Sequence, residues 1–262
     1  MKIGIIGAGN IGGTLTRRFS ALGHKVFVAN SRGPETLSDL ATETGATPVT
    51  VEQAALAGEV VIVTIPLRNI PFLPAGLFAK TPESVVVVDT SNYYPQQRDS
   101  RVDGIEKGIT ESRWVEQQLG RLVVKPFNTT YAEHLYELGR PAGTPGRIAL
   151  PVAGDDPAAK AVVLRLIDEL GFDGVDASGL DESWRQQPDT PVYATDLDAN
   201  GVRSALAKAS EGAQTGVACH SSQPWHVRSS GFESVSKNKS KSKAKRERKN
   251  KGDPYELDYR GY

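Results

Sequence analysis

Continuous apolar runs alternate with helical apolar periodicity along the first 176 residues. The β-branched runs at 59–65 and 84–89 predict strands that are buried on both faces of a parallel sheet. Apolar residues recur every three to four positions over 11–22, which predicts a helix. The same patterns predict strands at 2–6, 25–29, 47–49, 122–125, 148–153 and 172–175, and helices at 34–44, 50–57, 111–119, 131–138, 157–170 and near 200–209. This alternation predicts an α/β protein with a doubly wound, mostly parallel sheet.

The composition changes after residue 211. Residues 1–211 carry 20 Lys+Arg and 26 Asp+Glu, whereas residues 212–262 carry 11 and 5. The last segment holds only five residues among Leu, Ile, Val and Phe, too few to offset the entropy of ordering it. The sequence therefore predicts a larger α/β domain over 1–147, a smaller α/β portion over 148–211 and a disordered basic tail over 212–262.

The basic run at 237–251 has nine basic residues and one acid, so it is either a solvated tail or a segment for nuclear import or for holding nucleic acid or another anionic surface. Residues 1–211 have no comparable basic stripe, so we do not expect the folded part to bind nucleic acid.

The longest apolar runs are far shorter than the roughly 20 residues of a membrane span, so no membrane association is expected. Met1-Lys2 leads directly into a strand-like segment, unlike a signal peptide, and one cysteine excludes a disulfide scaffold. We expect a cytoplasmic protein.

A glycine motif joins the first predicted strand to the first predicted helix. The segment Gly7-Ala8-Gly9-Asn10-Ile11-Gly12 has the spacing G-x-G-x-x-G in the strand-to-helix context that a dinucleotide-binding Rossmann fold requires. In this context the first glycine makes the turn, the second lets the backbone approach a pyrophosphate, and the third lets the helix pack on the sheet. The helix N-terminus then offers N–H groups to the phosphates.

The end of the second predicted strand indicates which dinucleotide binds. An NAD site usually places Asp or Glu there, but this chain has Asn30-Ser31-Arg32 and no acid between Gly23 and Pro34. A hydroxyl and a guanidinium suit a 2′-phosphate, which a carboxylate would repel. The segment therefore favours NADP(H) over NAD(H), although it also reads as a polar surface turn.

Three further segments follow strands at the edge where open α/β sheets bind ligands. Their candidate cofactor contacts are Thr64, Ile65 and Pro66 after the fourth strand, Asn92 after the fifth and Asn128 after the sixth. Each segment is also an ordinary strand exit. Lys125 is the best candidate for protonating a substrate, but a structural or phosphate-facing role suits it better, and no catalytic residue is identified. His24, expected as a solvated turn residue, and His134 are isolated, so no metal site is predicted.

These segments together resemble a known family. Gly4 to Gly12, Asn30-Ser31-Arg32 and Thr64-Ile65-Pro66 are similar to the NADP oxidoreductases associated with coenzyme F420, and to the NADPH-binding domain of six-transmembrane metalloreductases. The resemblance implies that the diphosphate is held by Gly7, Gly9, Asn10, Ile11 and Gly12. It also implies that Ser31 and Arg32 hold the 2′-phosphate and that Thr64 and Pro66 flank the nicotinamide. The chain departs from the family at 125–128 and at 184–188.

The resulting hypothesis is an NADPH-dependent oxidoreductase that transfers a hydride between NADP(H) and a small, flat acceptor, with coenzyme F420 or a flavin as candidates. Two alternatives stay open. One is a non-catalytic NADP(H)-sensing module with a partner-binding tail, and the other is an imine reductase of the pyrroline-5-carboxylate type. Exposed sheet edges would allow a homodimer.

Overall fold

The protein is described by a computed structural model over residues 1–210. The predicted disordered tail over 212–262 and its basic run lie outside the described residues. The predicted boundary between the domains at 147 stays a prediction. None of the helices within residues 1–210 combines the length and the apolar character needed to cross a membrane.

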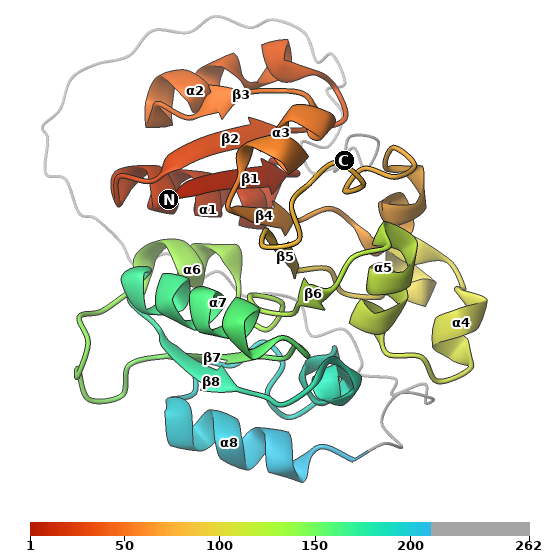
Figure 1. Ribbon diagram of the computed structural model, residues 1–262. Helices are drawn as coiled ribbons and strands as arrows, with labels where there is room; N and C mark the ends of the chain where they lie inside the picture. The colour runs from red at the N-terminus through yellow and green to blue at the C-terminus, as the bar shows by residue number, and fades with distance from the viewer. Residues whose placement is uncertain (211–262) are drawn as a thin grey trace, which may run out of the picture. The chain divides into compact units, whose positions relative to one another are not determined.

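Six parallel strands form the central sheet (Figure 1). They are β1 (Lys2–Ile6), β2 (Lys25–Ala29), β3 (Thr47–Pro48), β4 (Val60–Val63), β5 (Val86–Asp89) and β6 (Val123–Val124). Their order is β3-β2-β1-β4-β5-β6, so the direction of winding reverses between β1 and β4. This is the strand order of the Rossmann fold, with a switch point where ligands bind. The prediction of a doubly wound parallel sheet is confirmed.

Eight α-helices are present within the described residues. They are α1 (Asn10–Ala21), α2 (Ser38–Thr44), α3 (Val51–Ala57), α4 (Asp103–Glu106), α5 (Glu111–Leu119), α6 (Ala132–Glu137), α7 (Pro157–Glu169) and α8 (Ala199–Lys208). Four of them, α3, α5, α7 and α8, begin at a side-chain cap. Thr50 and Gln53 form the predicted capping box of α3, and Gly45 ends α2 at a φ of 72°. The predicted helix over 34–44 is divided, because a 3₁₀ turn, η1 (Pro34–Leu37), precedes α2.

Three short elements between strands and helices were not predicted. They are η2 (Leu67–Phe72) after β4, η3 (Pro95–Asp99) after β5, and η4 (Leu180–Gln186). α4 was not predicted either. Each is one or two turns long, which is too short for a helical apolar period to be recognised.

Both faces of the sheet are buried, as the continuous apolar strands predicted. In β4, Val60 and Ile62 face one hydrophobic cluster, whereas Val61 and Val63 face another. Residues of α1 and α7 belong to the first cluster and residues of α3 and α5 to the second. Alternation along each strand therefore supplies both cores with apolar side chains.

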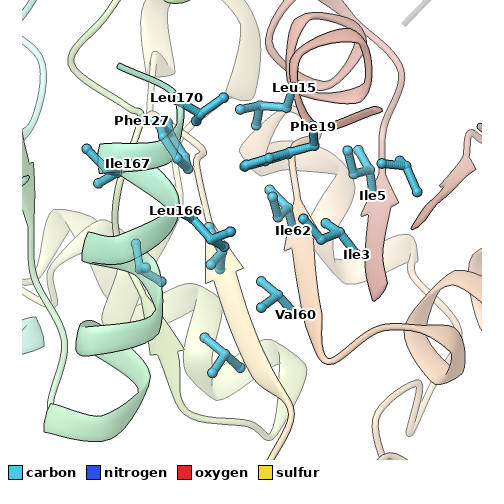
Figure 2. Close-up of a cluster of buried hydrophobic side chains, with 14 of the residues drawn as sticks. Ile3, Ile5, Leu15, Phe19, Val60, Ile62, Phe127, Leu166, Ile167 and Leu170 are labelled. Carbon is cyan, nitrogen blue, oxygen red and sulfur yellow. The ribbon is translucent and has the colours of Figure 1, made fainter. Parts of the chain in front are cut away.

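A second, two-stranded parallel sheet follows, made of β7 (Ala149–Val152) and β8 (Asp173–Asp176). Its connecting helix α7 contributes Leu166 and Ile167 to the cluster that covers β1 and β4, and Leu170, directly after the helix, belongs to the same cluster (Figure 2). The backbones of Lys125 and Ala153 exchange two hydrogen bonds of 2.8 and 3.2 Å between the ends of β6 and β7. The smaller sheet therefore continues the core of the larger one.

His24 also joins these parts, contrary to the expectation of a solvated turn residue. Its ring stands edge-on to Phe19, and Nε2 lies 2.8 Å from a carboxylate oxygen of Glu169 at the end of α7. The side chain is only 8% exposed. The tertiary position of α7 buries this ring, which the local sequence does not indicate.

Candidate dinucleotide and acceptor site

The carboxyl ends of five strands stand in one row. Parallel register aligns Ile6 with Ala29 on one side and with Val63 on the other, and Val63 with Asp89. The exits at residues 30, 7, 64, 90 and 125 therefore follow one another along the sheet. Adjacent strands are about 4.8 Å apart, so the exits of β2 and β5 are separated by about 14 Å. An extended ligand lying along this edge would meet the predicted segments in order.

The glycines of the first loop have the geometry that the motif predicted. Gly7 has a φ of 112°, and a Cβ there would fall on the carbonyl oxygen of Thr64. A Cβ at Gly12 would overlap the carbonyl oxygen of Gly7. A Cβ at Gly9 would meet no atom within 4 Å. Two glycines are thus required by the fold itself, while the third leaves open space beside the backbone.

The N-terminus of α1 has no side-chain cap and no acid in its first turn. Gly9 occupies the cap position, and the N–H of Gly13 donates the first helical hydrogen bond, to Gly9 at 2.7 Å. Asn10 and Ile11 therefore belong to the first turn, whose N–H groups lack partners within the helix. Such a terminus carries a partial positive charge. With the open space at Gly9, these residues fit a diphosphate.

The turn after β2 is shaped by Asn30. Its Oδ1 accepts the N–H of Arg32 at 2.9 Å, and its Nδ2 donates to Oγ1 of Thr36 at 2.9 Å. Both side chains of the Ser31-Arg32 pair are exposed. Asn30 thus holds the turn that presents the hydroxyl and the guanidinium, so a role in organising this turn suits it better than a direct ligand contact.

An acid that the sequence argument did not consider lies beside this turn. A Cβ on Gly33 would fall on Oε1 of Glu35, so the glutamate carboxylate folds back toward the turn. Glu35 is two residues beyond Gly33, directly after the segment from Gly23 to Pro34 that contains no acid. Its charge opposes that of a 2′-phosphate, and Arg32 would have to offset it.

The exit of β4 contacts the glycine loop. Cγ2 of Thr64 would lie 2.7 Å from a Cβ on Gly12, and Cγ2 of Ile65 would lie 2.8 Å from one on Gly7. Pro66 follows as the residue before η2. All three residues of this exit are partly buried. The structure therefore brings Thr64 and Ile65 against the loop that would hold the diphosphate.

Asn92 and Asn128 contact each other after β5 and β6. Nδ2 of Asn128 donates to Oδ1 of Asn92, and Nδ2 of Asn92 donates to the carbonyl oxygen of Asn128, both at 3.0 Å. Gln186 adds a bond from Nε2 to Oδ1 of Asn128 at 2.8 Å. Both amides are engaged by protein groups, and the two side chains differ in exposure: Asn128 is 4% exposed, whereas Asn92 is partly exposed. Of the two predicted contacts, Asn92 is the one open to a ligand.

The backbone before Asn128 takes a conformation that is rare outside glycine. Phe127 has a φ of 62°, and its side chain lies in the main hydrophobic cluster. A left-handed conformation of this kind costs of order 1 kcal/mol or more and concentrates at functional sites. Here the conformation lets Phe127 fill the core while Asn128 meets Asn92.

A pair of tyrosines that the sequence did not predict lies at the exit of β5. The hydroxyls of Tyr94, after β5, and Tyr193, in the segment between η4 and α8, share a short hydrogen bond. Nδ2 of Asn92 lies 3.4 Å from the hydroxyl oxygen of Tyr193. The aromatic residues after β5 were a signal for Tyr94, but no local pattern marks Tyr193.

Arg98 and Asp99, both in η3, hold Tyr94 in place. The buried carboxylate of Asp99 accepts the N–H of Tyr94 at 2.8 Å and Nη2 of Arg98 at 2.9 Å. The guanidinium carbon of Arg98 lies 5.0 Å from the ring centre of Tyr94, a cation–π contact. Nη2 of Arg98 also donates to the carbonyl oxygen of Asn92 at 2.6 Å. The polar groups after β5 are thus fixed by one buried acid.

Lys125 is fully buried beneath this site. Its Nζ donates to the carbonyl oxygen of Ser91 at 2.5 Å and lies 3.4 Å from Asp89 and 3.7 Å from Glu111. The lysine therefore has a structural role, and the reading of Lys125 as a proton donor to substrate does not fit its burial. Burial raises the pKa of Glu111 to about 7, although the charge of Lys125 opposes the rise. No group of three or more potential metal ligands occurs within residues 1–210.

Known proteins share sequence and structural similarity with this chain. The family model for NADP oxidoreductases, coenzyme F420-dependent, matches residues 2–93. The putative protein YjhV of Escherichia coli K12 is 49% identical over 74 residues, which are 28% of this chain and 54% of that protein. The chain thus spans about half the length of this curated relative.

Solved structures extend the likeness beyond residue 93. The hypothetical protein SMa0349 of Sinorhizobium meliloti is 32% identical with a TM-score of 0.64, covering 75% of this chain and 94% of that one. A putative F420-dependent NADP reductase of an Arthrobacter species is 25% identical with a TM-score of 0.56, covering 71% and 87%. A 3-hydroxyisobutyrate dehydrogenase of Mycobacterium tuberculosis, 15% identical with a TM-score of 0.52, shares the fold.

The Rossmann sheet, the open glycine loop and these similarities define the class as NADP-dependent oxidoreductases. Within this class, residues 2–93 match the family of NADP oxidoreductases that are coenzyme F420-dependent, and a putative F420-dependent NADP reductase has a similar structure. The resemblance noted from the sequence is confirmed, and so is the prediction of an oxidoreductase class that uses NADP(H). The role of each predicted site residue stays a prediction.

Proposed function

We propose that this protein is an NADPH-dependent reductase that binds NADP(H) along the exits of β2, β1 and β4 and reduces a flat acceptor at the exits of β5 and β6. The observation that carries the proposal is the uncapped N-terminus of α1 beside the open space at Gly9. It lies in the same row as the exposed Ser31-Arg32 turn. A diphosphate and a 2′-phosphate on one ligand would match these two places.

The protein's own residues bind and orient the reactants in this proposal. When bound, NADPH supplies a hydride from C4 of its nicotinamide. Thr64, Ile65 and Pro66 limit the space at the exit of β4, next to the glycine loop. Asn92 offers an amide from the exit of β5. Holding the donor and acceptor carbons at about 3–3.5 Å and excluding water is then the main task of the site.

For the acceptor, we propose coenzyme F420 or a flavin. The family description and the printed name of the Arthrobacter relative support a deazaflavin. The aromatic and amide side chains after β5 and β6 suit a flat ring. The reacting atom of such a ring, a carbon in a deazaflavin and a nitrogen in a flavin, takes a hydride without an acid at that atom, so the absence of a recognisable catalytic dyad in the sequence is compatible with this acceptor. We further propose a cytoplasmic location, for which a single cysteine is suited.

The test is NADPH oxidation by the purified full chain with four acceptors: coenzyme F420, a flavin, an aldehyde and a cyclic imine. Turnover with at least one acceptor, and a preference for NADPH over NADH, is the expected result. A protein that binds NADPH but reduces none of the acceptors would favour the non-catalytic sensing module instead. Preference for the imine would favour a reductase of the pyrroline-5-carboxylate type.

A further inference from the structure

The pair of tyrosine hydroxyls stands next in the row after the proposed nicotinamide position. β5 pairs with β4, and the N–H of Thr90 donates to the carbonyl oxygen of Val63 at 3.2 Å. Tyr94 follows four residues later, and its side chain is partly exposed. An acceptor that contacts the nicotinamide end at β4 would therefore extend toward Tyr94.

Two phenols that share a hydrogen bond always leave one hydroxyl hydrogen for a third atom. If Tyr193 donates to Tyr94, the hydrogen of Tyr94 is free, and the oxygen of Tyr193 still accepts from Asn92. Tyr193 is also partly exposed. The pair is thus arranged as a donor with a second hydroxyl behind it.

Arg98 makes Tyr94 the better donor of the two. Its guanidinium lies over the ring of Tyr94 and is held there by Asp99. A cation over the ring stabilises the phenolate that remains when the hydroxyl proton leaves. The hydrogen bond from Tyr193 stabilises the same oxygen. Tyr193 has no corresponding cation within the described contacts.

We propose that Tyr94 is a catalytic residue, which donates its hydroxyl proton to the electronegative atom of the acceptor, and that Tyr193 replaces this proton. The inference rests on the proposed function and states which chemical group the acceptor must carry. The acceptor carries a conjugated C=O or C=N group whose oxygen or nitrogen gains charge when the hydride arrives. A deazaflavin or flavin ring, an aldehyde and an imine share this chemistry.

The acceptor gains two electrons and two hydrogens in this step. Its reacting atom, a carbon or, in a flavin, a ring nitrogen, forms a bond to the hydride as the C4–H bond of NADPH breaks, and the π electrons move to the conjugated oxygen or nitrogen. That atom forms a bond to hydrogen as the O–H bond of Tyr94 breaks. The phenolate of Tyr94 then takes the proton of Tyr193, which water restores. NADPH is oxidised to NADP⁺ and the acceptor is reduced.

The ionisation of the two phenols is compatible with this role. Burial raises the pKa of Tyr94 and of Tyr193, so both are protonated at neutral pH. The hydrogen bond from Tyr193 and the charge of Arg98 oppose the rise in the pKa of Tyr94, while the acids Glu111 and Asp189 add to it. At Tyr193, burial is the largest cause of the raised pKa, and the neighbouring Tyr94 and Glu111 raise the pKa further.

The experiment compares Tyr94→Phe and Tyr193→Phe with the control Tyr136→Phe, which alters an exposed tyrosine on α6. Three quantities are measured on the full chain: the Kd of NADP⁺, the Kd of each oxidised acceptor for the NADP⁺-loaded protein, and the rate of single-turnover hydride transfer. The acceptors are coenzyme F420, a flavin, an aldehyde and a cyclic imine. The acceptor whose binding and rate change in Tyr94→Phe is the one that provides the C=O or C=N group.

We expect Tyr94→Phe to slow hydride transfer by about 10²–10⁴-fold. Its Kd for the acceptor should rise several-fold, while its Kd for NADP⁺ should stay unchanged, which also verifies folding. Tyr193→Phe should show a smaller loss, and the solvent deuterium isotope effect of the wild type should disappear in Tyr94→Phe. A rate and an acceptor Kd like those of Tyr136→Phe would overturn the inference and leave the proposed function intact. A wild-type protein that reduces no acceptor would overturn both.

Discussion

The ammonium nitrogen of Lys125 lies 3.4 Å from Oδ2 of Asp89, and neither side chain is exposed to solvent. Asp89 is the last residue of β5, and Lys125 follows β6 directly. Oδ2 of Asp89 also accepts the hydroxyl of Ser112 at 2.6 Å, and its Oδ1 accepts the N–H of Ser91 at 2.9 Å. These bonds tie the exits of two strands to the start of α5, directly below the polar groups of the candidate site.

Removing the positive charge from this cluster should destabilise the fold. In Lys125→Met, Asp89 and Glu111 would stay buried without their cation, which costs about 3–5 kcal/mol of the free energy of unfolding. Urea unfolding measures this change. The control Lys107→Met removes an exposed lysine that faces Asp103 on α4, and it should change the free energy by less than about 1 kcal/mol. Equal effects of the two variants would contradict the structural role of Lys125.

Glu111 should make stability depend on pH in a defined direction. Burial raises its pKa from 4.5 to about 7 in the folded protein, so the folded state binds more protons than the unfolded state between these values. The free energy of unfolding should therefore fall as the pH rises from about 4.5 to 7, by a few kcal/mol at most. Glu111→Gln should flatten this slope, as urea unfolding at several pH values would show.

The exposed glutamate Glu133, on α6, provides the matched control for this profile. Glu133→Gln should keep the pH profile of the wild type. If Glu111→Gln and the wild type gave parallel profiles, Glu111 would not be the group whose proton uptake shapes stability in this range.

Arg32→Ala should weaken NADPH binding by about 1.5–3 kcal/mol, because a charged hydrogen bond to the 2′-phosphate is lost. NADH affinity should change little. Glu35→Gln should act in the opposite direction, since its carboxylate lies beside the same turn. Isothermal calorimetry with both nucleotides checks each variant, and Arg203→Ala, at an exposed position on α8, is the control. Equal losses for NADPH and NADH in Arg32→Ala would count against a 2′-phosphate contact.

Two glycine substitutions should separate binding from folding. Gly9→Ala adds a Cβ in open space, so stability should stay unchanged while the methyl group blocks the approach of a diphosphate. Gly12→Ala places its Cβ on the carbonyl oxygen of Gly7, so it should lower both the melting temperature and the affinity. Thermal unfolding and NADPH titration of both variants test this difference. Unimpaired binding by folded Gly9→Ala would remove the main support for the proposed diphosphate site.

Local patterns predicted the elements that depend on neighbouring residues. The strand β1, the glycine loop and the start of α1 were predicted together. Within eleven residues, a continuous apolar run gives way to three glycines and to the start of a helical apolar period. The capping box of Thr50 and Gln53 was predicted from a spacing of three. In contrast, η2, η3 and η4 are too short to carry a period. The burial of His24 depends on Glu169, which is 145 residues away.

By itself, the sequence determined the parallel sheet, the glycine loop between β1 and α1 and the Ser31-Arg32 turn, since each follows from apolar periodicity or from adjacent residues. Only the tertiary structure decided which polar groups meet at the other end of the row. Tyr193 contacts Tyr94, which is 99 residues away in the sequence, and Lys125 contacts Asp89, which is 36 residues away. Such contacts form when separate elements pack against a common core, and no residue-to-residue spacing along the chain encodes them.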